Sequence, residues 1–180
     1  MLKYFSMRGL LLLLISLCLV GITYGQEKKE IIKIPWPPEY KWKIGSDQED
    51  QNIRIIELIP ENESIEKWTI IATVVLVKGA RNVPIESAMN LTFDQAKANA
   101  PKAKLTLFEK DEKSVHPWIL FKIESPNFKD DKNPESQLYY IIQGDENLYS
   151  NLVAMKEKTL SQEFVEKWSG IFKASQLILE

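Results

Sequence analysis

Residues 68–77 constrain the fold of this chain more than any other segment. They read Trp-Thr-Ile-Ile-Ala-Thr-Val-Val-Leu-Val and contain no charged side chain. Such a run is typical of a central β-strand that is covered on both faces. Ten residues would also suffice for a short helix, but the β-branched side chains make that alternative less favourable. The segment therefore predicts the middle of a buried sheet.

Shorter apolar stretches predict further strands before and after this run. Polar or proline-containing breaks separate them, and breaks this short are typical of antiparallel neighbours. The expected strands are residues 52–59, 104–109, 118–124, 137–143 and 148–155.

Two amphipathic helices are predicted as well. The first has one apolar stripe, formed by Ile85, Ala88, Met89, Phe93, Ala96 and Ala100. Pro84 suits its first turn and Pro101 blocks its continuation. The second follows a capping pattern at residues 159–162, and its inward face comprises Phe164, Val165, Trp168, Ile171, Phe172 and Ser175. Gly170 within it indicates close packing at that point.

These elements predict a single α+β domain over residues 52–180. An antiparallel β-sheet flanked by two amphipathic helices satisfies the rule that apolar faces are buried in layers. Residues 26–51 precede it as an extended arm rich in proline and aromatic residues. Trp36 and Trp42 in this arm either pack on the domain or form a docking motif. Packing is favoured because exposed Trp side chains are costly.

The first 25 residues predict a secretory signal peptide. Lys3 and Arg8 give it a basic start, an uncharged apolar stretch follows, and Thr23-Tyr24-Gly25 precedes an expected cut at Gln26. An uncleaved anchor is the alternative, since the apolar stretch is long for a signal. A lipid anchor is disfavoured because Leu17, not a small residue, precedes Cys18. The protein is therefore expected to be exported, to a periplasm or outside the cell, with no stable membrane insertion after cleavage.

Charge and cysteine content narrow the possible partners. Loss of the signal would leave 21 basic and 25 acidic residues, a formal net charge of −4. The sequence has no basic stripe, so nucleic acid is not an expected partner. Cys18 is the only cysteine and lies in the signal. Disulfides, thiolate metal sites and cysteine nucleophiles are then excluded from the mature chain.

No residue qualifies as a catalytic, cofactor-binding or metal-binding candidate, and no cofactor is expected. His116 is the only histidine, but no Gly-x-Ser-x-Gly segment offers a nucleophile for it to activate. The acidic loop at residues 127–135 lacks the alternating order and central glycine of a calcium loop, so a solvated turn is favoured. Glycine-rich phosphate-binding motifs are also missing from the sequence.

The order of the expected elements resembles the PsbP/Mog1-like fold, an α/β/α sandwich. Residues 59–69, which carry a Pro60-Glu61-Asn62-Glu63-Ser64 turn leading into Trp68-Thr69, are similar to a segment of uncharacterised secreted bacterial proteins. The resemblance covers residues 52–177. It implies a fold and a compartment, and it brings no catalytic residues with it.

Export combined with a complete domain that lacks reactive motifs suggests a non-catalytic domain. We expect it to bind a protein partner or a small ligand. Two alternatives stay open. One is a hydrolase or other enzyme whose site is not recognisable in a sequence, and the other is an assembly or accessory factor of the cell envelope.

Overall fold

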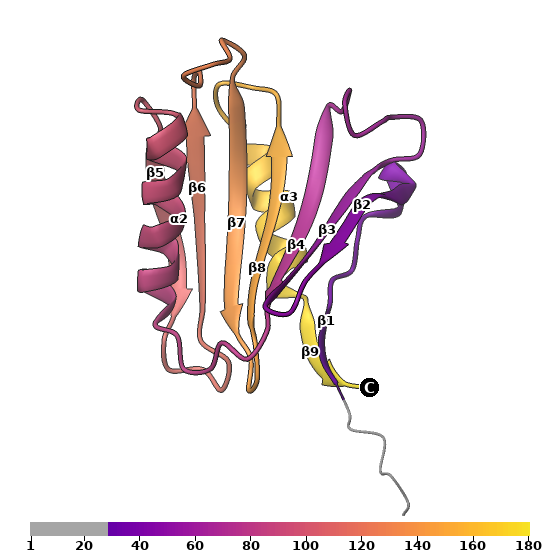
Figure 1. Cartoon of the computed structure of the whole chain (residues 1–180), viewed down its shortest axis with the longest axis vertical. Helices are drawn as coiled ribbons and strands as arrows, with labels where there is room; N and C mark the ends of the chain where they lie inside the picture. The colour runs from indigo at the N-terminus through magenta and orange to yellow at the C-terminus, as the bar shows by residue number, and fades with distance from the viewer. Residues whose placement is uncertain (1–28) are drawn as a thin grey trace, which may run out of the picture.

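The computed structural model describes residues 29–180. The predicted signal peptide, residues 1–25, lies outside the described residues. Strands make up 44% and helices 20% of the structure. Figure 1 shows one large twisted sheet with a helix on each face and a short strand pair at one end.

The large sheet is antiparallel throughout, and its seven strands do not follow chain order. Their spatial order is β2 (Trp42–Glu49), β3 (Ile53–Pro60), β4 (Ile70–Val77), β8 (Leu148–Met155), β7 (Glu135–Gln143), β6 (Trp118–Ser125) and β5 (Lys104–Asp111). A second sheet pairs β1 (Glu30–Lys33) with β9 (Gln176–Leu179). The short η1 turn (Pro38–Tyr40) links β1 to β2.

The two helices bury opposite faces of the large sheet. Helix α2 (Ile85–Asn99) places Ile85 and Met89 against the face that carries Ile119 and Ile141. Helix α3 (Gln162–Lys173) covers the other face, and its N-cap is Ser161, whose hydroxyl accepts a hydrogen bond from the Phe164 N–H at 3.2 Å. The alternation of side chains along each strand supplies these two faces.

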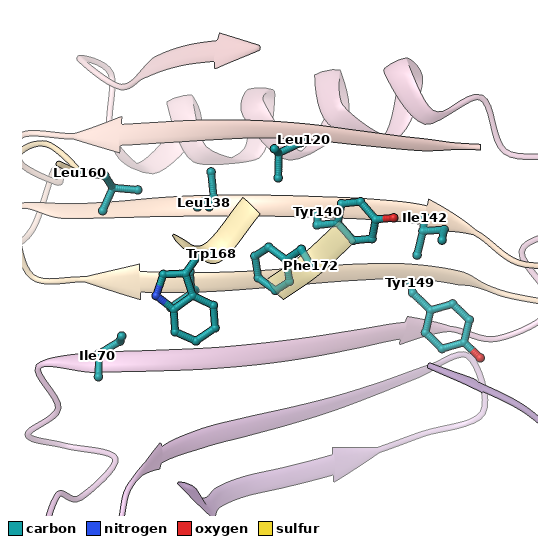
Figure 2. Packing of buried hydrophobic residues seen from close by; sticks show 10 residues of the cluster. Ile70, Leu120, Leu138, Tyr140, Ile142, Tyr149, Leu160, Trp168 and Phe172 are labelled. Atoms are coloured by element: carbon teal, nitrogen blue, oxygen red, sulfur yellow. The ribbon is translucent and has the colours of Figure 1, made fainter. Parts of the chain in front are cut away.

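Trp168 is the centre of the core beneath α3. It is fully buried, as is Phe172 one turn later on the same helix. Figure 2 shows both side chains lying over the sheet between Ile70 and Tyr140. The Tyr140 and Phe172 rings stack with centroids 5.9 Å apart, and burial raises the pKa of Tyr140 to about 12.

The expected α/β/α sandwich is wrong. The structure is mostly sheet, and its two helices do not flank the whole of it. Helix α2 contacts mainly β6 and β7, and α3 contacts mainly β7, while at the other end of the sheet α3 meets β2 through the rings of Trp168 and Trp42. The difference arises because the chain forms three strands that the sequence did not predict, β1, β2 and β9. Two of them, β1 and β2, come from residues set apart as an arm.

The described part of that arm packs on the sheet. Trp36 and Trp42 lie with ring centroids 6.3 Å and 6.1 Å from Trp168, and Tyr40 stacks on Trp168 at 5.9 Å. Strand β2 pairs with β3 along its full length, apart from a bulge between Ile44 and Ser46. These residues therefore pack on the domain, and the aromatic side chains of the arm extend its core.

Candidate functional site

A narrow crevice separates β1 from the large sheet, and we call it the β1 crevice. Its inner part has a volume of about 110 Å³ and is almost entirely apolar. The side chains that line it are Ile31 and Ile32 of β1, Ile56 of β3, Val74 and Leu76 of β4, and Tyr149 of β8, with Glu30 and Arg54 at its boundary.

The crevice widens into a charged mouth of about 600 Å³. Glu30, Ile31, Arg54 and Leu76 line both parts, so the two form one continuous depression. The mouth adds Lys29, Glu49, Lys78, Arg81, Glu146 and Asn147. Its volume lies within the range of roughly 300–1,000 Å³ that is usual for small-molecule sites.

Ion pairs fix most of the charged side chains at the mouth. Arg54 binds Asp47 through two nitrogens at 3.0 Å and 2.8 Å, which raises the pKa of Arg54. Lys78 donates to Glu49 at 2.6 Å, and this hydrogen bond holds the pKa of the Glu49 carboxyl below its usual value. Arg81 lies 3.4 Å from Glu146. The rim is therefore preorganised, although pairs this exposed contribute little to stability.

Glu30 fastens β1 to the turn between β7 and β8. The residue is 5% exposed, and its carboxylate accepts hydrogen bonds from the backbone N–H groups of Asp145 at 2.6 Å and Glu146 at 3.3 Å. The Asn147 amide donates to the same carboxylate, and the Tyr149 hydroxyl donates to the Glu30 carbonyl oxygen at 2.7 Å. Burial and the nearby Glu30 charge raise the pKa of Tyr149. These contacts set the position of β1 and hence the width of the crevice.

Gly144 makes this attachment possible, because a Cβ at that position would overlap the Glu30 carboxylate. We expect Gly144→Ala to displace Glu30, to break its hydrogen bonds and to cost roughly 1–3 kcal/mol of unfolding free energy. Urea unfolding measures this loss, and hydrogen exchange should show weaker protection of β1.

Gly170 supplies the matched control for that change. It lies in α3 with nothing within 4 Å of a Cβ, so the close packing expected there is absent. Gly170→Ala should leave stability unchanged or raise it by up to about 1 kcal/mol, since alanine is the better helix former. Equal losses in the two variants would contradict the role given to Glu30.

The residues that the sequence suggested for catalysis or metal binding, and that were disfavoured there, lie outside the β1 crevice. His116 sits outside the β1 crevice, and its Nδ1 is 4.0 Å from an oxygen of Asp145. The hydroxyl of Ser114 donates to the backbone carbonyl of His116 rather than to its imidazole. In the acidic loop, Asp131 accepts from the backbone of Asn133 at 2.9 Å, as in a solvated turn. Within residues 29–180 no group of three or more potential metal ligands occurs.

A second depression, of about 550 Å³, lies at the N-terminus of α2. Several of its polar groups already have partners within the fold. Glu86 and Glu112 both bind Lys110, and the buried Gln143 amide bonds to the backbone of Val83 and Ala80, among others. The lining of this depression is polar and apolar in equal measure, whereas the inner β1 crevice is almost entirely apolar, and we therefore take the crevice as the candidate site.

Sequence reasoning did not identify the β1 crevice. Glu30, Arg54, Val74 and Tyr149 are far apart in the chain, and no motif connects them. The available signal was an acidic residue followed by two isoleucines, shortly before the proline-rich segment. This pattern suits a short strand but does not indicate which strand it pairs with.

Comparisons with known proteins leave the family open. No protein-family model matches the sequence, and no curated protein matches it. The resemblance to the PsbP/Mog1-like family therefore stays a prediction. None of the helices formed by residues 29–180 is long and apolar enough to cross a membrane.

Proposed function

We propose that this protein is an exported binding domain that holds a small ligand in the β1 crevice. One observation carries the proposal: a single depression passes from an apolar interior to a charged rim. Binding sites for small molecules commonly combine an apolar lining with a few placed polar groups. Export itself follows from the sequence of residues 1–25 and is part of the proposal.

The surroundings of the crevice favour binding over covalent chemistry. The carboxylate of Glu30 is occupied by hydrogen bonds to the β7–β8 turn, and burial raises the pKa of the Tyr149 hydroxyl, which keeps it protonated. Arg54 and Lys78 are fixed by their acidic partners. These groups can orient a ligand in a preformed site, which lowers the entropy lost on binding.

Filling the inner crevice should weaken binding of an apolar probe. The probe is 1-anilinonaphthalene-8-sulfonate, whose fluorescence rises in apolar surroundings. Val74 faces the crevice from β4, so Val74→Trp should weaken probe binding at least about tenfold, the equivalent of 1.4 kcal/mol. Fluorescence titration of the chain that begins at Gln26 measures the dissociation constant.

Leu91→Trp is the matched control, since Leu91 is 60% exposed on α2 and away from the crevice. It should leave the dissociation constant unchanged. Thermal unfolding of both variants checks that each is folded. If Val74→Trp does not fold, Ile56→Phe fills the same crevice from β3 and replaces it in the test. Undiminished probe binding in folded Val74→Trp and Ile56→Phe would refute the β1 crevice as the site.

A further inference from the structure

We infer that the ligand of the β1 crevice is an anionic amphiphile, with an apolar chain in the inner part and its anionic group at the mouth. The inference rests on the proposed function and adds the class and the orientation of the ligand.

The inner crevice suits a slender apolar chain. Five aliphatic side chains and the ring of Tyr149 form its walls, and its 110 Å³ accommodates several water-sized groups. Figure 2 places Tyr149 at the end of the buried cluster away from Trp168, with its hydroxyl pointing outward. That hydroxyl is bonded to the Glu30 carbonyl oxygen, so it offers the ligand no free proton donor. A polar group would gain nothing in this part of the crevice.

The mouth has more donor capacity than acceptor capacity. Its acids are Glu30, Glu49 and Glu146. The carboxylate of Glu30 is buried and bonded to the backbone, and one oxygen of Glu49 is bound to Lys78 while the other lies 3.6 Å from Arg54. Two of the three acids therefore already have partners, which reduces their capacity to receive a ligand cation.

Two cations at the mouth remain able to bind a ligand. The Arg81 side chain is 62% exposed and makes one contact of 3.4 Å, to Glu146. A guanidinium has five N–H donors, so most of those on Arg81 remain available. Lys29 lines the same mouth, and no ion pair joins it to another described residue. Both lie where the head of a molecule inserted chain-first would emerge.

The charge preference should be moderate, because these cations are exposed and screened by salt. A matched series with one chain and three head groups measures it: octanoate, 1-octanol and octylammonium. Each compound displaces 1-anilinonaphthalene-8-sulfonate from the chain that begins at Gln26. We expect octanoate to bind about five- to tenfold more tightly than octylammonium, with 1-octanol between them, as one or two exposed charge pairs would give.

The double variant Lys29→Gln, Arg81→Gln should reduce that ratio to within about twofold, because both positive charges are lost while the inner crevice is intact. Lys167→Gln is the control. Lys167 pairs with Glu39 on the outer side of α3, away from the crevice, so the ratio should be unchanged.

The outcomes separate the two proposals. If all three compounds bind equally, or octylammonium binds best, the anionic preference is overturned while the binding site stands. If none of the three compounds displaces the probe and Val74→Trp leaves the affinity for the probe unchanged, both the anionic preference and the proposed function are refuted. Vesicles of phosphatidylcholine with and without phosphatidylglycerol form the last arm. Sedimentation with the anionic vesicles without binding of monomeric octanoate would indicate recognition of a lipid surface and would overturn the crevice assignment.

Discussion

Deletion of residues 26–50 is expected to leave a chain that no longer folds cooperatively. The deletion removes β1 and β2, which pair with β9 and β3. It also removes the aromatic rings that cover Trp168, and it exposes the edge of β3 to solvent. Far-UV circular dichroism and thermal unfolding of the truncated chain, expressed behind residues 1–25, measure the effect. A cooperative transition at an unchanged temperature would contradict it and would restore the view of this segment as a docking arm.

The double substitution Trp36→Ala, Trp42→Ala separates side-chain packing from strand pairing. It retains every backbone hydrogen bond between β2 and β3 but opens a cavity above α3. A large loss of stability in this variant, close to that of the deletion, would show that packing on Trp168 dominates. A small loss would show that the added strands contribute chiefly through the sheet.

The six expected strands all match strands of the structure to within two residues at each end, and three of them have the clearest local signal. Residues 52–59, 68–77 and 118–124 are dense in β-branched and aromatic side chains, and they match β3, β4 and β6 to within two residues at each end. Such side chains favour strands, so the local sequence carries the signal. The stripe of α2 is equally local: Ile85 and Met89 are buried as expected.

The strands that were not predicted carry no such signal. Strand β2 is an edge strand with a bulge, and its residues after Gly45 are mostly polar. Edge strands are often polar or bulged because such features oppose aggregation. Strands β1 and β9 have four residues each and lie at opposite ends of the described chain. Their pairing is a property of the tertiary fold, and the β1 crevice, which depends on β1, could not be predicted without it.

Trp168→Ala is the point substitution with the largest expected effect, about 3–5 kcal/mol of unfolding free energy. The side chain is fully buried and lies within 6.3 Å, between ring centroids, of Trp36, Tyr40 and Trp42. Rings of this size cannot all move into the cavity that alanine would leave. Urea unfolding followed by circular dichroism measures the loss.

Two further substitutions make this test specific. Trp168→Phe should cost less than Trp168→Ala, because most of the ring volume is retained and the indole N–H has no hydrogen-bond partner among residues 29–180. Phe93→Ala should cost roughly 1–2 kcal/mol, since Phe93 is half-buried on α2 with the Lys97 ammonium 5.6 Å from its ring centroid. The sequence alone placed Phe93 and Trp168 on the inward faces of the two helices. A loss below about 1 kcal/mol for Trp168→Ala, or a greater loss for Phe93→Ala, would place the centre of the core on the α2 side of the sheet instead.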